Sequence, residues 1–211
     1  MQEPLTPQRL QQGVEALVKR EPSFAKVVEQ CNLPPFWQRA PGFPTLIQII
    51  LEQQVSLASA NSAYKRLLVS ADPLSPESFL QLTDVDLKQI GFSRQKISYG
   101  RTLAHAIQEQ TLNLSALEAL SDQAVRDHLI RIKGIGIWTA NIYLLMALRR
   151  ADIWPRGDLA LHVAIQQLME LPKRPTADEA QTMSLAWQPW RSVAARLLWH
   201  FYLSQRQQTY S

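Results

Sequence analysis

The chain has 211 residues, of which 46% are hydrophobic and 19% are charged, and its formal net charge is +4. A chain of this size can bury a sizeable core, and it has no apolar run near the roughly 20 residues that a membrane-spanning helix needs. The single cysteine, Cys31, excludes intramolecular disulfides and cysteine-ligated zinc or iron–sulfur sites. That cysteine count and an N-terminus without a secretory pattern lead us to expect an intracellular protein that is not secreted.

Helix signals follow one another along the whole chain. Four predicted helix starts share a capping residue followed either by proline or, three positions later, by glutamate: Thr6-Pro7, Ser75-Pro76, Ser115-x-x-Glu118 and Thr176-x-x-Glu179. Between such starts apolar residues recur every three or four positions, and no period-two alternation bounded by hairpin turns is found. The sequence therefore predicts an all-α fold of about nine to eleven helices.

Two of the predicted helices are joined by a short glycine turn. Ser121 is expected to cap a helix that runs to about Ile132, and a second helix is expected over residues 137–148. The link, residues 133–136, reads K-G-I-G and is short enough to make the two helices antiparallel neighbours. Its glycines allow backbone N–H groups to approach a phosphate at the positive end of the second helix.

Each residue of this link has an expected role. Gly134 and Gly136 expose the backbone, and Ile135 plugs the turn into the core of its own hairpin. Lys133 and Thr139 add a positive charge and a hydroxyl donor for a phosphate. The same pattern also fits an inert helix–turn–helix with a glycine C-cap, so the hairpin alone leaves both interpretations open.

Four motifs together carry a family resemblance. The hairpin sequence K-G-I-G-I-W-T-A and the following P-R-G-D-L-A-L, residues 155–161, resemble the helix–hairpin–helix superfamily of DNA glycosylases. I-L-E-Q-Q-V-S at residues 50–56 and W-Q-P-W-R-S-V-A-A at residues 187–195 resemble its alkylpurine branch, the 3-methyladenine DNA glycosylase II type. The resemblance covers about residues 42 to 204, and four motifs in the right order are far more specific than any one alone.

The resemblance implies a compact, two-lobed all-α fold that lacks the β-rich N-terminal lobe of some members. We expect one catalytic domain over residues 1–211. Its hairpin lobe is expected at about residues 72–170, with the hairpin itself at 121–149. The second lobe is expected to combine residues 1–71 with residues 171–211.

The resemblance also implies that Asp158 is the catalytic carboxylate. An ordinary alternative is that Asp158 only caps the helix beginning near Leu159, and the two roles are compatible because a cap also orients the side chain. Asp152 is a weaker rival, which we interpret as a solvated loop charge.

The substrate explains why one carboxylate is enough. Alkylation at a ring nitrogen makes a purine cationic, so the base leaves as a neutral molecule without needing a proton. What remains is an oxocarbenium-like sugar, which a nearby carboxylate stabilises. This predicts hydrolysis of the N-glycosidic bond of alkylated purines, of the 3-methyladenine and 7-methylguanine type, in double-stranded DNA, as a step of base-excision repair that leaves an abasic site.

Two positions distinguish this chain from relatives with other chemistry. Relatives that also cut the strand carry a lysine nucleophile where this chain has Trp138, so we expect a monofunctional enzyme without a lyase step. Adenine glycosylases carry a glutamate where this chain has Ile49, and they bind an iron–sulfur cluster that the lone Cys31 cannot support. Two alternatives stay open: a glycosylase of the same fold for deaminated or etheno purines, and a catalytically inactive DNA-structure-binding relative.

By resemblance, the everted base is held in a pocket lined by Trp138, Trp199 and Ile142, since aromatic faces attract a cationic base. The gap left in the duplex is filled by a wedge, expected at Gln54, at a junction where Ser56 caps the next helix. Gln53 is expected beside it, holding the junction or contacting the DNA backbone. A second basic cluster around residues 88–101, with Lys96 and Arg101, is either an auxiliary phosphate contact or a solvated face.

No cofactor is expected to be required. In relatives a monovalent cation is held by hairpin carbonyls, which correspond here to Ile130, Ile132 and Ile135. We expect a monomer whose partner is DNA containing alkylated bases, located in the nucleoid of the cytoplasm or in the nucleus.

Overall fold

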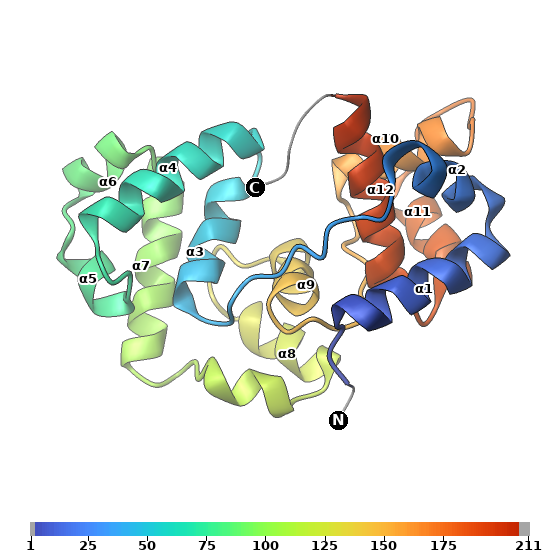
Figure 1. Ribbon diagram of the computed structural model, residues 1–211. Coiled ribbons are helices and arrows are strands. Elements are labelled where there is room, and N and C mark those ends of the chain that lie inside the picture. The colour runs from blue at the N-terminus through green and yellow to red at the C-terminus, as the bar shows by residue number, and fades with distance from the viewer. Residues whose placement is uncertain (1–2, 207–211) are drawn as a thin grey trace. The chain divides into compact units, whose positions relative to one another are not determined.

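The computed structural model describes residues 3–206, in which every regular element is helical (Figure 1). These residues form twelve α-helices and two short 3₁₀ helices, η1 and η2, and they contain no strand. The predicted all-α fold is therefore confirmed, with slightly more helices than the expected range of about nine to eleven. None of the helices in this part of the chain combines the length and apolarity that crossing a bilayer requires.

The helices gather in two compact units, of which the first spans Arg39–Leu148 and the second joins residues 3–38 to residues 149–206. The first unit contains α3 (Phe43–Glu52), α4 (Leu57–Ser70), α5 (Pro76–Gln81), α6 (Asp84–Ile90), α7 (Arg94–Gln108), η1 (Ser115–Ala119), α8 (Asp122–Leu129) and α9 (Ile137–Met146). The second contains α1 (Pro7–Arg20), α2 (Pro22–Cys31), α10 (Leu159–Leu168), α11 (Ala177–Ser184), η2 (Leu185–Trp187) and α12 (Arg191–Gln205).

These boundaries differ from the lobes expected from the sequence, which divided the chain near residues 71 and 170. Helices α3 and α4 belong with the hairpin helices because α3 packs against both α7 and α9. Helix α10 belongs with the helices near the termini because it packs along α12. Both packings join segments far apart in the chain, which local sequence patterns do not reveal.

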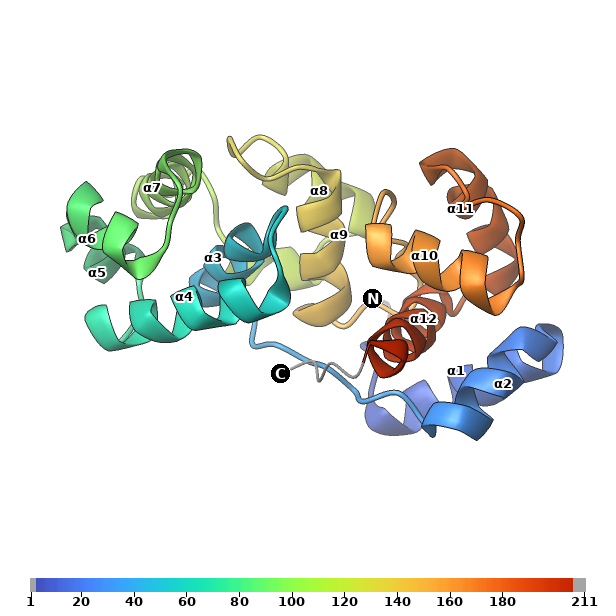
Figure 2. The ribbon, with the colours of Figure 1, turned by 90° about the horizontal axis from the view of Figure 1, so that it is seen from above.

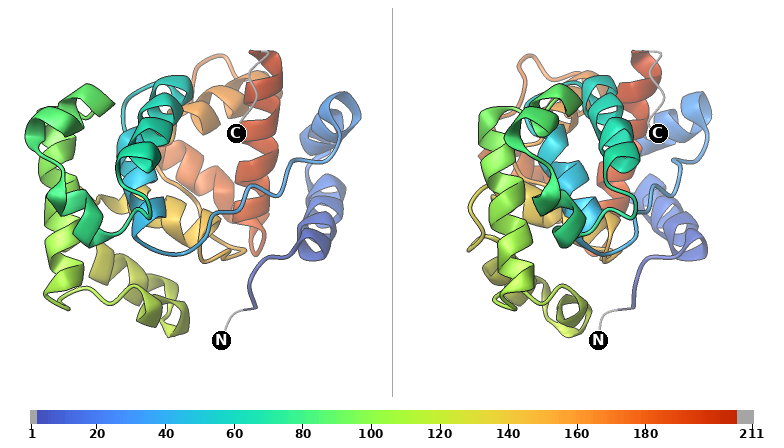
Figure 3. Two further views of the ribbon diagram at one scale, coloured as in Figure 1. Left: turned by 60° about the vertical axis from the view of Figure 1, so that its left-hand side comes forward. Right: turned by 90° about the vertical axis from the view of Figure 1, so that its left-hand side faces the viewer.

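Helix α9 forms the centre of the first unit. Each of its residues from Thr139 to Met146 is buried, and a helix that is apolar on all sides must be surrounded by other elements. Figure 1 shows α3 and α8 alongside it, and Figure 3 shows α7 (green) beside α3 (light blue). The buried hydroxyl of Tyr143 accepts the backbone N–H of Gly42 at 3.0 Å, which ties the start of α3 to α9.

Helix α12 plays the corresponding part in the second unit. It packs against α10 and against α1 and α2 (Figure 2). Its Arg196 is fully buried, and its guanidinium donates to the backbone oxygens of Phe36 at 3.2 Å, Trp37 at 3.3 Å and Ser192 at 3.2 Å. A buried charge is tolerated when it is hydrogen-bonded in this way, so Arg196 fastens residues 36–37 to α12.

Most of the predicted helix starts are confirmed. Thr6, Ser75 and Thr176 each accept a backbone N–H in the first turn of their helices, and Thr176 forms the complete capping box with Glu179. The box predicted at Ser115 is wrong. That segment is the 3₁₀ helix η1, and Asn113 instead accepts the backbone N–H of Ala116 at 3.2 Å.

Candidate active site and DNA interface

The glycine turn joins α8 and α9 as a helical hairpin. Ser121 caps α8, as predicted, although that helix ends at Leu129 rather than near Ile132. Arg126 Nε donates to Asn141 Oδ1 at 2.7 Å and links the two helices across the hairpin. Ile135 is 3% exposed and its N–H bonds to the carbonyl of Ile132 at 3.0 Å, so the predicted anchoring role is confirmed.

Gly134 and Gly136 serve different purposes. Gly134 has a φ of +96°, and a Cβ placed there would lie 2.1 Å from Cγ of the Tyr99 ring, so the fold itself requires glycine. Gly136 has an extended backbone with φ of −89°, and no described heavy atom would lie within 4 Å of a Cβ there. An inert turn accounts for Gly134 but gives no reason for Gly136.

Gly136 stands at the N-terminus of α9, where the helix exposes backbone N–H groups. No side chain in the described residues forms a cap hydrogen bond at this end. Gly136, Ile137 and Lys133 are exposed, so the positive end of the helix is open to an anion with a cation close by in sequence. The geometry fits a DNA backbone phosphate approaching the bare Gly136.

Gln53 holds this hairpin in place. It ends α3, and its Nε2 donates to the carbonyl of Gly134 at 2.9 Å and to Oγ1 of Thr139 at 3.0 Å. Gln53 therefore holds the junction, as expected, and its amide is committed to the hairpin rather than to the wedge. Thr139 is 2% exposed with its hydroxyl turned to Gln53, so the predicted phosphate contact through Thr139 is wrong.

Gln54 follows in an unusual backbone conformation. Its φ is +56°, a left-handed conformation that non-glycine residues rarely adopt, and it is exposed at the turn between α3 and α4. On one side, Glu52 is locked by two hydrogen bonds from Arg39 at 3.0 and 2.7 Å. On the other, Ser56 caps α4 as predicted, and Val55 is 47% exposed. A strained, protruding residue on a rigid base has the geometry expected of a wedge, and Val55 is an apolar neighbour that the sequence reasoning missed.

Asp158 lies in the second unit as the N-cap of α10. Its Oδ1 accepts the N–H of Leu161 at 3.1 Å and the indole Nε1–H of Trp199 at 3.3 Å. The residue is 9% exposed. The capping role is therefore confirmed, and the structure brings together two residues that the sequence assigned to one site from positions 41 apart.

The turn before Asp158 is also fixed. Its N–H bonds to the carbonyl of Pro155 at 3.2 Å, and Gly157 has a φ of +84°. Arg156 forms an ion pair with Asp178 at the start of α11, with 2.5 Å between Nη2 and Oδ1. The carboxylate is thus held by bonds on its own side chain and by a tight turn behind it.

Asp152 is not a rival for the catalytic role. It accepts from Arg191 Nε at 2.8 Å and Nη2 at 2.9 Å, and from the Arg191 backbone N–H at 3.2 Å. Its side chain is only 23% exposed, so the prediction of a solvated loop charge is wrong as well. A carboxylate neutralised by a bidentate arginine is a structural partner rather than a reacting group.

His162 was missed by the sequence reasoning as a member of this site. It lies one helical turn after Asp158 on α10 and is 8% exposed. Burial lowers its pKa below the usual 6.5, the nearby Asp158 charge opposes that shift, and Arg174 adds to it. The spacing of four residues from a helix N-cap was the available signal, since residues i and i+4 share a helix face.

The two remaining pocket residues lie on α9 in the first unit. Trp138 occupies its first turn and is half-buried, while Ile142, one turn later, is 3% exposed. Their assignment to the base pocket stays a prediction.

Part of the second basic cluster is committed to the fold. Lys96 Nζ donates to the carbonyl of Leu51 at 2.7 Å, and burial lowers its pKa. Arg101 pairs with Asp84 at 2.7 Å and also donates to the carbonyl of Leu82 at 2.9 Å. These two side chains therefore hold α7 against its neighbours. Of the two interpretations offered for this cluster, phosphate contact or solvated face, neither describes Lys96 and Arg101, which have a structural role.

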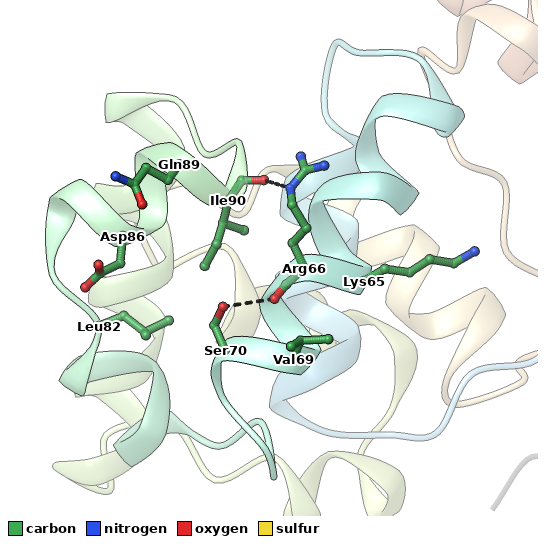
Figure 4. A pocket seen from close by; sticks show the side chains of 8 residues that line it. All are labelled: Lys65, Arg66, Val69, Ser70, Leu82, Asp86, Gln89 and Ile90. Atoms are coloured by element: carbon green, nitrogen blue, oxygen red, sulfur yellow. Dashed lines mark hydrogen bonds between the residues drawn. The ribbon is translucent and has the colours of Figure 1, made fainter.

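A groove of about 560 Å³ in the first unit is lined by Lys65, Arg66, Val69, Ser70, Leu82, Asp86, Gln89 and Ile90 (Figure 4). None of the predicted site residues lines it. Arg66 crosses from α4 to donate to the carbonyl of Ile90 at 2.8 Å, so the groove is the seam between α4 and α6.

Comparison with known proteins identifies the family to which this chain belongs. A family profile described as HhH-GPD superfamily base excision DNA repair protein matches residues 47–192. The chain belongs to this superfamily. The HhH-GPD match includes the Gln53 junction, the hairpin and Asp158, whereas Trp199 lies beyond it.

Several members are similar over most of the chain. The alkylbase DNA glycosidase-like protein mag2 of Schizosaccharomyces pombe is 28% identical over 196 residues, covering 90% of this chain and 92% of that protein. DNA-3-methyladenine glycosylase 1 of the same organism is 30% identical, covering 74% and 71%. A crystal structure of a DNA-3-methyladenine glycosidase from Bacillus halodurans superposes with a TM-score of 0.74 at 27% identity, covering 92% and 91%. Two Bacillus subtilis relatives are longer, and the chain spans 56% and 58% of their lengths.

Alanine substitutions at the two hairpin glycines should have different effects, one on stability and the other on DNA binding. Gly134→Ala, with its left-handed backbone and the clash with Tyr99, is expected to lose about 2 kcal/mol or more of unfolding free energy in urea titrations. Gly136→Ala should stay within about 0.5 kcal/mol of the parent while its affinity for duplex DNA, measured by fluorescence anisotropy, falls. If Gly136→Ala binds duplex DNA as tightly as the parent protein, the assignment of a phosphate contact at Gly136 is wrong.

Substitutions of Gln53 and Gln54 should likewise have different effects, one on stability and the other on base release. Gln53→Ala loses two hydrogen bonds to the hairpin and is expected to cost about 1–3 kcal/mol of stability. Gln54→Gly suits the left-handed backbone, so stability should be kept or raised while base release from duplex DNA falls about tenfold or more. Release from single-stranded DNA, which needs no wedge, should be unaffected. Equal losses on both substrates would contradict a wedge at Gln54.

Proposed function

We propose that this chain is a monofunctional DNA glycosylase that hydrolyses the N-glycosidic bond of alkylated purines, of the 3-methyladenine and 7-methylguanine type, in double-stranded DNA. The observation that carries the proposal is the orientation of Asp158 by the Leu161 N–H and the Trp199 indole. Membership of the HhH-GPD superfamily and similarity to relatives named as DNA-3-methyladenine glycosylases, such as glycosylase 1 of Schizosaccharomyces pombe, support it.

The proposed hydrolysis needs from the protein mainly one negative charge in the right position. The C–N glycosidic bond of a cationic purine breaks with its electron pair going to the base, which leaves neutral. The sugar becomes oxocarbenium-like, and the Asp158 carboxylate stabilises that positive charge. Water then forms the new C–O bond and gives up a proton to solvent or carboxylate, leaving an abasic site.

The fixed geometry of Asp158 makes that stabilisation effective. A carboxylate already oriented by two donors, and only 9% exposed, does not have to reorganise as charge develops. These two bonds both end on Oδ1 and come from uncharged donors, unlike the guanidinium that pairs with Asp152.

Elements of the first unit supply binding in this proposal. The open N-terminus of α9 and Lys133 contact a phosphate, and Gln54 fills the space that the everted nucleotide leaves. Trp138 on α9 offers its ring to the everted base, whose positive charge favours an aromatic face by roughly 0.5–2 kcal/mol.

We propose further that the hydrolytic step requires no cofactor. The hairpin carbonyls of Ile130, Ile132 and Ile135 would hold a monovalent cation, and a carbonyl that already accepts one hydrogen bond, as Ile132 does, keeps a second lone pair for it. Bound there, the cation would add positive charge for the DNA strand. The enzyme acts as a monomer on damaged DNA in the nucleoid or nucleus.

Asp158→Asn is the sharpest test of the proposal. Asparagine is as good an N-cap as aspartate, so the fold should survive while the charge is lost. Release of 3-methyladenine from methylated DNA should fall at least about 100-fold with duplex affinity retained. The matched control, Glu29→Gln on α2, removes an exposed carboxylate from the same unit and should keep full activity.

The same assay ranks the alternatives. Oligonucleotides containing hypoxanthine or ethenoadenine, compared with methylated DNA, identify a glycosylase for deaminated or etheno purines. Full activity of Asp158→Asn, or no release from any of these substrates by the parent, would overturn the proposal, and the second result with intact DNA binding identifies a structure-binding relative.

The lyase question has its own measurement. Trp138 stands where strand-cutting relatives carry lysine, and an indole cannot form a Schiff base. Borohydride added during turnover should therefore trap no covalent enzyme–DNA adduct. A trapped adduct would show that another amine attacks the sugar and that the enzyme is not monofunctional.

A further inference from the structure

His162 stands behind Asp158 on the same helix and has an unusual environment. Its backbone N–H donates to the carbonyl of Asp158 at 3.2 Å, which is the first helical bond of α10. Its side chain is 8% exposed, and within the described part of the chain its buried Nε2 has no hydrogen-bond partner. A buried imidazole nitrogen without a partner costs stability, so its presence here calls for an explanation beyond packing.

The charges around His162 point to a neutral ring. Burial is the largest influence and lowers its pKa from 6.5, the Asp158 carboxylate raises it, and Arg174 lowers it again. A neutral imidazole leaves the negative charge of Asp158 undiminished, whereas an imidazolium one turn away would offset it.

Other charged groups on the helices packed against α10 are engaged elsewhere. On α12, Arg191 pairs with Asp152, Arg196 binds backbone carbonyls, and His200 bonds to the carbonyl of Cys31. On α11, Asp178 pairs with Arg156, and Glu179 closes the capping box of its own helix. Asp158 and Arg174 are thus the charged groups that act on His162.

We propose that His162 is a positioning residue that sets the charge available at Asp158: its neutral form leaves the negative charge of the carboxylate undiminished beside a cationic sugar, and its protonated form offsets that charge and suppresses base release. The inference rests on the proposed function of Asp158. Because the His162 pKa lies below 6.5, the suppressed state belongs to acidic conditions, and the neutral ring prevails at neutral pH.

The coupling between the two side chains can be measured without any activity. Nitrogen-15 NMR of the histidine rings gives the His162 pKa in the wild type and in two variants of opposite sign. Asp158→Asn should lower it, since a raising charge is lost, and Arg174→Gln should raise it. The exposed His105 on α7 is the internal reference and should not move in either variant. A His162 pKa above 6.5, or one that Asp158→Asn leaves unchanged, overturns the inference.

A pH profile of the reaction tests the consequence. Single-turnover release of 3-methyladenine, corrected for loss without enzyme, should fall about tenfold one pH unit below the His162 pKa in the wild type. His162→Gln should keep its plateau rate at that pH, whereas the matched variant His105→Gln should show the wild-type decline. Identical profiles for His162→Gln and the wild type overturn the inference even when the enzyme is active. A wild type that releases no alkylated base at any pH instead overturns the proposed function, and the NMR titration still decides the coupling.

Discussion

One carboxylate oxygen, Oδ1 of Asp158, joins the folding of the second unit to its proposed chemistry. It accepts the N–H of Leu161, which begins α10, and the indole N–H of Trp199, which belongs to α12. These two helices pack along each other, so the bond pattern that stabilises their contact also aims the side chain. Folding and the proposed catalysis therefore place the same demand on the geometry of this side chain and differ only in the demand for its charge. An uncharged cap is expected to substitute in the first role and not in the second.

The first unit contains a comparable device built on an amide. Gln53 ends α3 and reaches with one nitrogen to both the Gly134 carbonyl and the Thr139 hydroxyl, so the hairpin and the α3–α4 turn form one connected structure. Gln54, next in the chain, is left exposed in a left-handed backbone. Two adjacent residues of the same type thus have different environments, and the half-buried, hydrogen-bonded Gln53 gives the exposed Gln54 a rigid support.

What could be predicted from the sequence was local in origin. Caps at Thr6, Ser56 and Asp158, the glycine turn and the all-α class depend on spacings of four residues or fewer, which one sequence displays directly. The errors came from contacts between distant segments. The burial of Thr139 follows from Gln53, the pairing of Asp152 follows from Arg191, and the unit boundaries follow from packing of α3 and α10. His162 shows the intermediate case: its spacing from Asp158 was visible, but its unpartnered ring nitrogen requires knowledge of what surrounds α10.

The distinction between local and distant contacts also bears on DNA binding. This protein has a net charge of only +4, and the question is how it would bind a polyanion. Side chains that a sequence assigns to phosphate binding are partly committed inside the fold, as Lys96 to the Leu51 carbonyl and Arg101 to Asp84 illustrate. Backbone N–H groups at the start of α9 carry no such commitment to a side-chain cap in the described residues. Helix-end amides attract a phosphate through fixed dipoles and do not release as many counterions as a row of lysines, so the salt dependence of binding should be shallow. Binding of this kind favours accurate placement of one strand over strong general attraction, which suits the proposed reaction, in which one sugar has to meet one carboxylate.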